Sequence, residues 1–156
     1  EFFDTYPHKN LFLCGAPGLG KTFLSACIAR VVSEKGYSVV YDTASNVFAR
    51  FEARKFIRFG EDARQAGADT RRYLTCDLLI LDDLGSEMTT PFVQSALYTL
   101  VNARLMADRR TVISSNLSLD AIRQRYSAQV ASRLEGMYQT LVFFGQDIRM
   151  LKKQQR

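Results

Sequence analysis

Short apolar runs alternate along the chain with longer segments whose apolar residues recur every three or four positions. Each short run predicts a buried strand, and these runs cover residues 10–15, 37–42, 76–83, 110–116 and 138–145. The spacing in the longer segments predicts helices over residues 21–34, 91–107, 119–126 and 128–136. Strands that alternate with helices predict an α/β fold, a three-layer sandwich around a mostly parallel five-stranded sheet.

Length and composition indicate one globular domain spanning residues 1–156. Of its 156 residues, 47% are hydrophobic and 24% are charged, which suffices for a self-contained core. No apolar run approaches the roughly 18 residues that cross a bilayer, so we expect a cytoplasmic protein without a membrane partner. Cys14, Cys27 and Cys76 lie in apolar contexts without metal-ligand spacing, and are expected in the core. The net charge of +5 mildly favours an anionic partner.

A glycine-rich stretch follows the first predicted strand. Residues 15–22 read GAPGLGKT and match G-x-x-x-x-G-K-[ST], in the strand–loop–helix setting that this motif requires. Glycines let backbone N–H groups turn toward phosphate oxygens, and the next helix adds the positive end of its dipole. Lys21 would reach the β- and γ-phosphates, and the Thr22 hydroxyl would ligate Mg²⁺. The predicted nucleoside triphosphate site comprises Gly15, Pro17, Gly18, Leu19, Gly20, Lys21, Thr22 and Phe23.

Two adjacent carboxylates follow a second buried strand. Asp82 and Asp83 come directly after the apolar run at 78–81, at the sheet edge where open α/β folds bind ligands. We assign Asp82 to the Mg²⁺ shell, directly or through water, and Asp83 to the general base that polarises the attacking water. The cation would neutralise one carboxylate while the other stays free to accept a proton.

An amide and an arginine come later in the chain. Asn116 ends the fourth predicted strand, where it could sense the γ-phosphate, cap the next helix, or do both. Arg133 lies on a short helix and could supply positive charge to a neighbouring subunit, or form a surface salt bridge. The first of these roles would complete the site only in a homo-oligomer. The sequence has no N-K-x-D pattern for guanine, which favours ATP over GTP.

A basic helical insertion is expected at residues 45–75, between the second and third strands. Residues 50–72 contain seven basic residues against four acidic ones. At helical spacing Arg50, Arg54 and Arg58 form one stripe, while the phenylalanines of this segment lie mostly on another. This stripe could follow a phosphate backbone as a basic ridge, or be the solvated face of a helix whose phenylalanines pack in the core.

Together these motifs resemble the AAA+ ATPases, and within them the DnaC/DnaI replicative helicase loaders and the IstB-type transposition helpers. The matching stretches span residues 10–153 and read GAPGLGKT, LLILDDLG, SSN, ASRL and DIRMLKK. The resemblance implies sensor 1 at Asn116, an arginine finger at Arg133 and a sensor 2-like residue at Arg149 that contacts the nucleotide. It also implies a Walker A loop and a Walker B pair, formed by Gly15, Gly18, Gly20, Lys21 and Thr22, and by Asp82 and Asp83.

Two features depart from this family's pattern. Asp83 stands where most AAA+ proteins carry glutamate, and its shorter reach could slow hydrolysis. We also expect no helical lid domain, which would leave Arg149 on the basic tail at 146–156. The chain also begins at Glu1 rather than methionine, and we expect that a partner-binding N-terminal domain has been removed.

The resemblance implies an ATPase with Mg²⁺ as cofactor that assembles on single-stranded DNA. Its leading interpretation is a loader whose client is a replicative helicase. A transposition helper would differ only in its client, a transposase. A nucleotide-dependent switch with little hydrolysis is a third alternative. A small-molecule kinase is disfavoured because no inserted lid segment is visible in the sequence.

Overall fold

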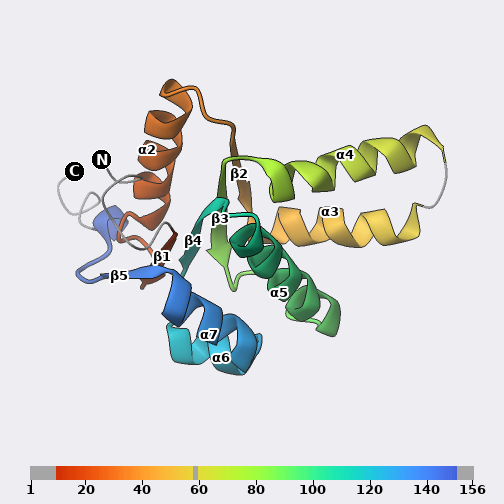
Figure 1. The fold of residues 1–156 in the computed structure, drawn as a ribbon. Coiled ribbons are helices and arrows are strands. Elements are labelled where there is room, and N and C mark those ends of the chain that lie inside the picture. The colour runs from red at the N-terminus through yellow and green to blue at the C-terminus, as the bar shows by residue number, and fades with distance from the viewer. Residues whose placement is uncertain (1–9, 58–59, 151–156) are drawn as a thin grey trace.

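Five parallel strands form the central sheet of the protein in a computed structural model that describes residues 10–57 and 60–150 (Figure 1). From one edge to the other they are β2 (Val39–Thr43), β3 (Leu78–Leu84), β4 (Arg110–Ser115), β1 (Leu11–Gly15) and β5 (Gln139–Phe143). All five predicted strands are confirmed, with bounds that differ from the predicted ones by at most two residues. The predicted mostly parallel sheet is parallel throughout.

Both faces of the sheet are covered. Helix α2 (Lys21–Glu34) packs on one face, where β1 contributes Leu11 and Leu13. The opposite face receives Phe12 and Cys14, and packs against α5 (Pro91–Met106), α6 (Leu119–Arg125) and α7 (Ala128–Met137). Because successive residues of a strand point to opposite faces, one continuous apolar strand supplies both layers.

The starts of three helices follow from hydroxyl side chains. Thr90 accepts a hydrogen bond from the backbone N–H of Val93, and Pro91 occupies the first turn of α5. Ser118 and Ser127 cap α6 and α7 in the same way. Each cap satisfies a backbone donor that the first helical turn leaves without an intrahelical partner. The predicted start of α5 at Thr90 and Pro91 is therefore confirmed.

The predicted helical insertion is a pair of helices that projects from the sheet (Figure 1). It consists of α3 (Ala44–Phe56) and α4 (Glu61–Thr75), which pack against each other. Arg50 donates to Asp69 at 3.1 Å, and Arg54 donates to the Thr70 hydroxyl at 3.0 Å. Both arginines of the predicted stripe thus contact α4, and Arg50 forms an ion pair there. Arg58 lies outside the described residues.

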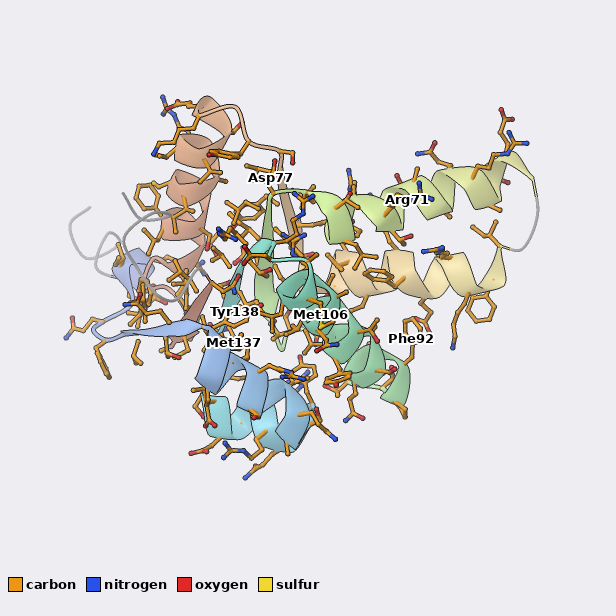
Figure 2. All side chains as sticks on the ribbon, viewed as in Figure 1. Arg71, Asp77, Phe92, Met106, Met137 and Tyr138 are labelled. Atoms are coloured by element: carbon orange, nitrogen blue, oxygen red, sulfur yellow. The ribbon has the colours of Figure 1, made fainter. Side chains whose placement is uncertain are left out.

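The phenylalanines of the insertion divide between core and surface. Phe48 is buried, and the Phe51 ring packs on Tyr73 with 5.9 Å between ring centroids. Phe56 is 79% exposed, and Phe59 lies outside the described residues. Near the far end of α3, Lys55 places its ammonium 4.6 Å from the centroid of the ring of Phe92, the residue at the start of α5 that Figure 2 labels. The core interpretation holds for the phenylalanines near the sheet and not for Phe56.

A buried arginine joins the insertion to the sheet. Arg104 of α5 is 0% exposed and donates to the backbone carbonyls of Tyr73, Cys76 and Arg110 at 2.7, 3.1 and 2.6 Å. It also donates to the hydroxyl of Thr111 at 2.9 Å. Burial lowers the pKa of Arg104, because a guanidinium is costly to remove from water. Three carbonyls and one hydroxyl, all of them neutral, accept these hydrogen bonds and replace the water lost on burial.

Two of the three cysteines occupy the predicted environment. Cys14 and Cys76 are buried, and burial raises the pKa of both thiols. Cys27 is exposed on α2, so its predicted place in the core is wrong. Helical periodicity grouped Cys27 with the apolar residues of α2. The face of α2 that contacts the sheet includes Leu24, Ile28 and Val32 but does not extend to Cys27. Within the part of the chain that the structure describes, no helix has the length and apolarity needed to span a bilayer.

We expect Arg104→Met to lower the free energy of unfolding by about 3 kcal/mol, because three buried carbonyls would lose their donor. Urea denaturation measures this loss. The matched control is Arg123→Met on α6, which removes exposed ion pairs with Asp120 and Glu135 and should cost less than about 1 kcal/mol. Equal losses in the two variants would contradict the role of Arg104.

Candidate functional site

A cavity of about 610 Å³ opens where the loops after β1, β3 and β4 meet. Ten of the predicted site residues line it: Pro17, Gly18, Gly20, Lys21, Thr22, Phe23, Asp82, Asp83, Asn116 and Arg149. Thr43, Ser114 and Ile148, which were not predicted, complete the lining. Gly15, Leu19 and Arg133 do not line it. The cavity lies at the carboxyl ends of parallel strands, where adjacent strand ends converge.

The glycine loop leaves the start of α2 open. Gly18 and Gly20 have φ angles of +78° and +96°, a region that residues with a Cβ rarely adopt. Gly20 is the N-cap of α2, and therefore no side chain accepts from the first turn. The first turn also contains no acidic residue. The first N–H groups of α2 and its positive dipole end are thus available to an anion.

Lys21 lies at the bottom of this loop. Its side chain is buried, and its ammonium donates to the backbone carbonyls of Gly15 and Ala16 at 2.6 and 2.7 Å. Burial is the largest influence on the Lys21 ammonium and lowers its pKa, while the nearby carboxylates of Asp83 and Asp82 act in the opposite direction. The ammonium has three donors, two of which bind the loop itself. The loop therefore positions a cation beside the open helix terminus.

The carboxylate of Asp82 is buried and surrounded by hydroxyl groups. Only 5% of the residue is exposed. Thr22 donates to its two oxygens at 3.3 and 3.1 Å, Tyr41 donates to Oδ2 at 2.8 Å, and Ser114 donates to Oδ1. A buried carboxylate is stable only where such donors replace water. Burial, followed by the hydrogen bond to Asp82, raises the pKa of Tyr41, so that its hydroxyl remains a donor.

Asp83 has a different environment from its neighbour. The pairing of β3 with β4 shifts register between Leu81 and Leu84, and Asp83 adopts a φ of +57°. Its backbone N–H donates to the hydroxyl of Ser114 at 2.9 Å, while its side chain is exposed at the cavity. Such an irregularity redirects a side chain at the end of a strand. One carboxylate is therefore enclosed and the other is free, as the predicted division of roles requires.

Asn116, which follows β4, and Arg149, which lies beyond β5, both line the cavity. Asn116 is exposed and lines the cavity, whereas Ser118 caps α6, so the alternative of a capping Asn116 is wrong. Arg149 follows β5, and its charge acts on Lys21 by lowering the pKa of that ammonium. The structure thus brings a cationic side chain from the end of the described chain to the glycine loop.

The segment before Arg149 packs on the glycine loop. The backbone N–H of Ile148 donates to the carbonyl of Gly18 at 3.0 Å. The carboxylate of Asp147 accepts from the backbone N–H of Arg149 at 2.8 Å, and lies where a Cβ on Gly18 would be. Gly18 is therefore required both by its φ angle and by the close approach of Asp147.

Arg133 lies outside the cavity of its own chain. It is exposed on α7, and no ion pair of its side chain is found among the residues that the structure describes. The surface salt bridge considered from the sequence is therefore wrong within those residues. Its exposure leaves the guanidinium accessible from outside the chain.

Sequence reasoning missed three residues that shape the site: Tyr41, Ser114 and Asp147. Ser114 belongs to the SSN stretch, in which only Asn116 was assigned a role from the sequence. Tyr41 could have been found from strand alternation, since it shares a face of β2 with Thr43, which lines the cavity. The place of Asp147 depends on how the chain returns after β5, for which the sequence holds no signal.

The residues around Asp82 fit Mg²⁺. This ion keeps several waters and takes one or two protein ligands, with phosphate oxygens completing its shell. The Thr22 hydroxyl directs its hydrogen to Asp82, which leaves its lone pairs available to a cation. Within residues 10–57 and 60–150 no group of three or more His, Cys, Asp or Glu side chains could hold a metal ion by itself. A cation here would thus depend on phosphate oxygens and water.

We expect Gly18→Ala to destabilise the protein by at least about 1 kcal/mol more than Gly20→Ala. Both alanines would adopt a left-handed φ at a cost of about 1–2 kcal/mol, but only the Cβ at Gly18 would displace Asp147, while the position at Gly20 is open. Urea denaturation of both variants measures the difference. In an Asp147→Ala background the two variants should become equal, and a persisting difference would contradict this explanation.

The amino-acid sequence of this chain is similar to those of known ATP-binding proteins and helicase loaders. The DnaI replicative helicase loader of Bacillus subtilis (strain 168) is 30% identical over 133 residues, which cover 81% of this chain and 39% of DnaI. A protein named as an insertion sequence ATP-binding protein, y4pL of Sinorhizobium fredii, is 30% identical over 115 residues, 73% of this chain and 44% of y4pL. The chain thus spans less than half the length of these relatives.

The fold has a solved counterpart in the crystal structure of the DnaC helicase loader. The two superpose with a TM-score of 0.76 at 22% identity, covering 92% of this chain and 84% of that chain. At this level of identity the likeness shows the fold alone, which confirms the predicted three-layer α/β sandwich. The sequence profile described as IstB-like ATP binding protein matches residues 2–136. The chain therefore belongs to the family of IstB-like ATP-binding proteins.

Proposed function

We propose that this protein binds ATP with Mg²⁺ and hydrolyses it. The observation that carries the proposal is the position of Asp82, whose enclosed carboxylate binds Thr22 directly after the open end of α2. An anion site and a cation site thus adjoin each other, as a magnesium-bound triphosphate requires. The family supports nucleotide binding in general terms.

Each residue around the cavity would have its own task. Lys21 would exchange its bonds to the loop carbonyls for bonds to β- and γ-phosphate oxygens. Thr22 and Asp82 would hold Mg²⁺, which neutralises phosphate charge when bound. Asp83 would accept a proton from the attacking water, and Asn116 would orient that water beside the γ-phosphate. Arg149 would contact the phosphates from the far side of the loop.

Arg133 would act on the nucleotide of a neighbouring subunit. It is exposed and does not line the cavity of its own chain, so a role in hydrolysis requires a second copy. An arginine supplied from outside stabilises charge on the transferred phosphoryl group. The active form would then be a homo-oligomer, and the isolated monomer would hydrolyse ATP slowly.

We expect Lys21→Ala to abolish ATP binding, and Arg133→Ala to preserve binding while losing turnover. Mixing the two variants should restore part of the turnover, because the first still supplies Arg133 and the second still holds ATP. Equilibrium binding of ATP and phosphate release measure the two effects. Binding of ATP by Lys21→Ala would contradict the nucleotide site, and an inactive mixture would contradict the action of Arg133 between subunits.

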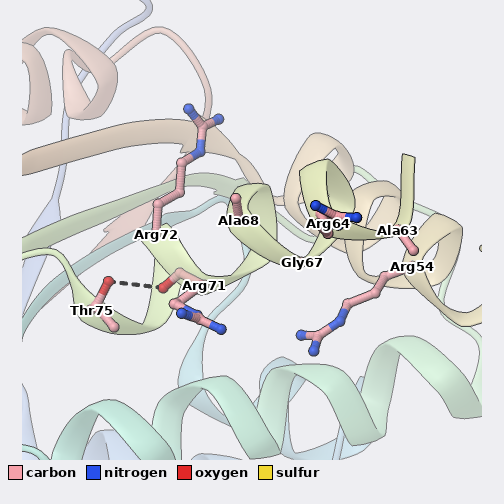
Figure 3. Close-up of a pocket in the computed structure, with 8 residues that line it drawn as sticks. All are labelled: Arg54, Ala63, Arg64, Gly67, Ala68, Arg71, Arg72 and Thr75. Atoms are coloured by element: carbon pink, nitrogen blue, oxygen red, sulfur yellow. Dashed lines mark hydrogen bonds between the residues drawn. The ribbon is translucent and has the colours of Figure 1, made fainter. Parts of the chain in front are cut away.

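The insertion offers a surface for single-stranded DNA. A groove of about 590 Å³ runs along one face of α4, with Ala63, Gly67 and Ala68 among its lining (Figure 3). Its other lining residues are Thr75 and the arginines Arg54, Arg64, Arg71 and Arg72. In Figure 3 the side chains of Arg54 and Arg71 point toward one another, while Arg72 points away. Small residues between arginines let a phosphate backbone approach closely.

The groove shares Arg54 with the stripe for which a basic ridge was one interpretation. Among the described residues, Arg64 and Arg71 have no carboxylate partner, so their charges are available to phosphates. Such contacts would be largely independent of base sequence and sensitive to salt. The net charge of +5 is consistent with an anionic partner.

We propose that ATP-dependent assembly on single-stranded DNA serves to load a replicative helicase. The similarity to DnaI supports this role. The similarity to y4pL supports the alternative of a transposition helper, whose client is a transposase. The two roles differ in the client and not in the chemistry of the cavity. Either client would be recognised by segments outside the part of the relatives that this chain matches.

We expect Arg64→Ala combined with Arg71→Ala to weaken binding of oligo-dT and to reduce its salt dependence. Removing two phosphate contacts should lower the slope of log K against log salt by about 1.4. Fluorescence anisotropy over a series of KCl concentrations measures the slope. The control, Arg30→Ala with Arg123→Ala, removes the same charge from arginines with acidic partners and should leave the slope unchanged. An unchanged slope in the groove variant would contradict the DNA site.

A further inference from the structure

Tyr41 is connected to the cavity without lining it. It lies on β2 at the edge of the sheet and is 37% exposed. Its hydroxyl donates to Asp82 Oδ2 at 2.8 Å, from the strand adjacent to β3. The ring spans the space between the sheet edge and a carboxylate that is 5% exposed. Tyr41 is thus a partly exposed residue with a polar end directed inward.

The hydrogen bonds of Asp82 divide unequally between its two oxygens. Oδ1 accepts from Ser114 and, at 3.3 Å, from Thr22. Oδ2 accepts from Tyr41 at 2.8 Å and from Thr22 at 3.1 Å. Without Tyr41, the remaining donor to Oδ2 among the described residues would be Thr22, the hydroxyl that also faces the cation site. Tyr41 therefore holds Oδ2 independently of any change at Thr22.

We propose that Tyr41 is a positioning residue for Mg²⁺. Its hydroxyl fixes the orientation of the Asp82 carboxylate, which in turn accepts from Thr22 and would face the ion. The inference rests on the proposed function. The carboxylate has a rotatable bond, and a donor at each oxygen prevents rotation about it. Tyr41 would touch neither ATP nor the ion, so its effect should be confined to conditions in which Mg²⁺ is present.

The test is Tyr41→Phe, which removes the hydroxyl and keeps the ring. The dissociation constant of a fluorescent ATP analogue is measured in EDTA and in MgCl₂, and the ratio of the two constants reports the contribution of the ion. We expect the constant in EDTA to match wild type and the gain from Mg²⁺ to fall about tenfold, since one hydrogen bond to a charged group is lost. Tyr98→Phe on α5 is the control, which should behave as wild type in both buffers.

The alternative is a structural role for the hydroxyl at the edge of the sheet. The melting temperature of Tyr41→Phe, measured in EDTA without nucleotide, reports separately how much the hydroxyl contributes to the stability of the fold. A wild-type ratio in Tyr41→Phe would overturn the proposal, and so would an equal loss of affinity in both buffers, since that pattern indicates a deformed cavity. A wild-type chain that binds no analogue in either buffer would instead overturn the proposed function, and the role of Tyr41 toward the ion with it.

Discussion

The buried carboxylate of Asp82 is the constraint on which the site depends. At 5% exposure it has lost most of its hydration, which must be replaced by protein donors. Those donors come from α2, β2 and β4, through Thr22, Tyr41 and Ser114. They can meet at one carboxylate only if β3 lies between β2 and β4 and the loop after β1 reaches across to it. The order of the sheet and the position of the glycine loop are therefore fixed by the same group.

Strand β2 joins the cavity to the helical insertion. Tyr41 bonds to Asp82, while its neighbour Asp42 accepts from the Tyr73 hydroxyl at 2.7 Å and from the Asn46 amide at 3.0 Å. Successive residues of a strand point to opposite faces of the sheet. Tyr41 therefore contacts the carboxylate beside the cavity, while Asp42 contacts the helical insertion. Arg104 holds the same end of α4 through the carbonyls of Tyr73 and Cys76. The arginine groove thus stands on helices that are fixed to the sheet at the end nearest to it.

The sequence was sufficient for contacts that are local or recurrent, and insufficient for those that join distant segments. Periodicity predicted every strand, and the glycine motif with the residue after it predicted six of the thirteen residues that line the cavity, because both depend on residues close together in the chain. A helical wheel could not predict that Arg50 and Arg54 bind α4, since that depends on how two helices pack. For Tyr41, strand alternation indicates the face of β2 on which it lies, but not its partner, which lies in another strand.

The pair of aspartates shows how the backbone separates two identical side chains. Asp82 ends the regular part of β3 and points into the hydroxyl cluster. The shift of register after Leu81 and the φ of +57° at Asp83 direct the next carboxylate to the cavity. Aspartate tolerates this region better than most residues with a Cβ, so the strain is small. A longer glutamate at position 83, starting from the same backbone, would extend farther into the cavity than this aspartate does. The reach of the second carboxylate into the cavity is therefore set by the backbone as much as by the side chain.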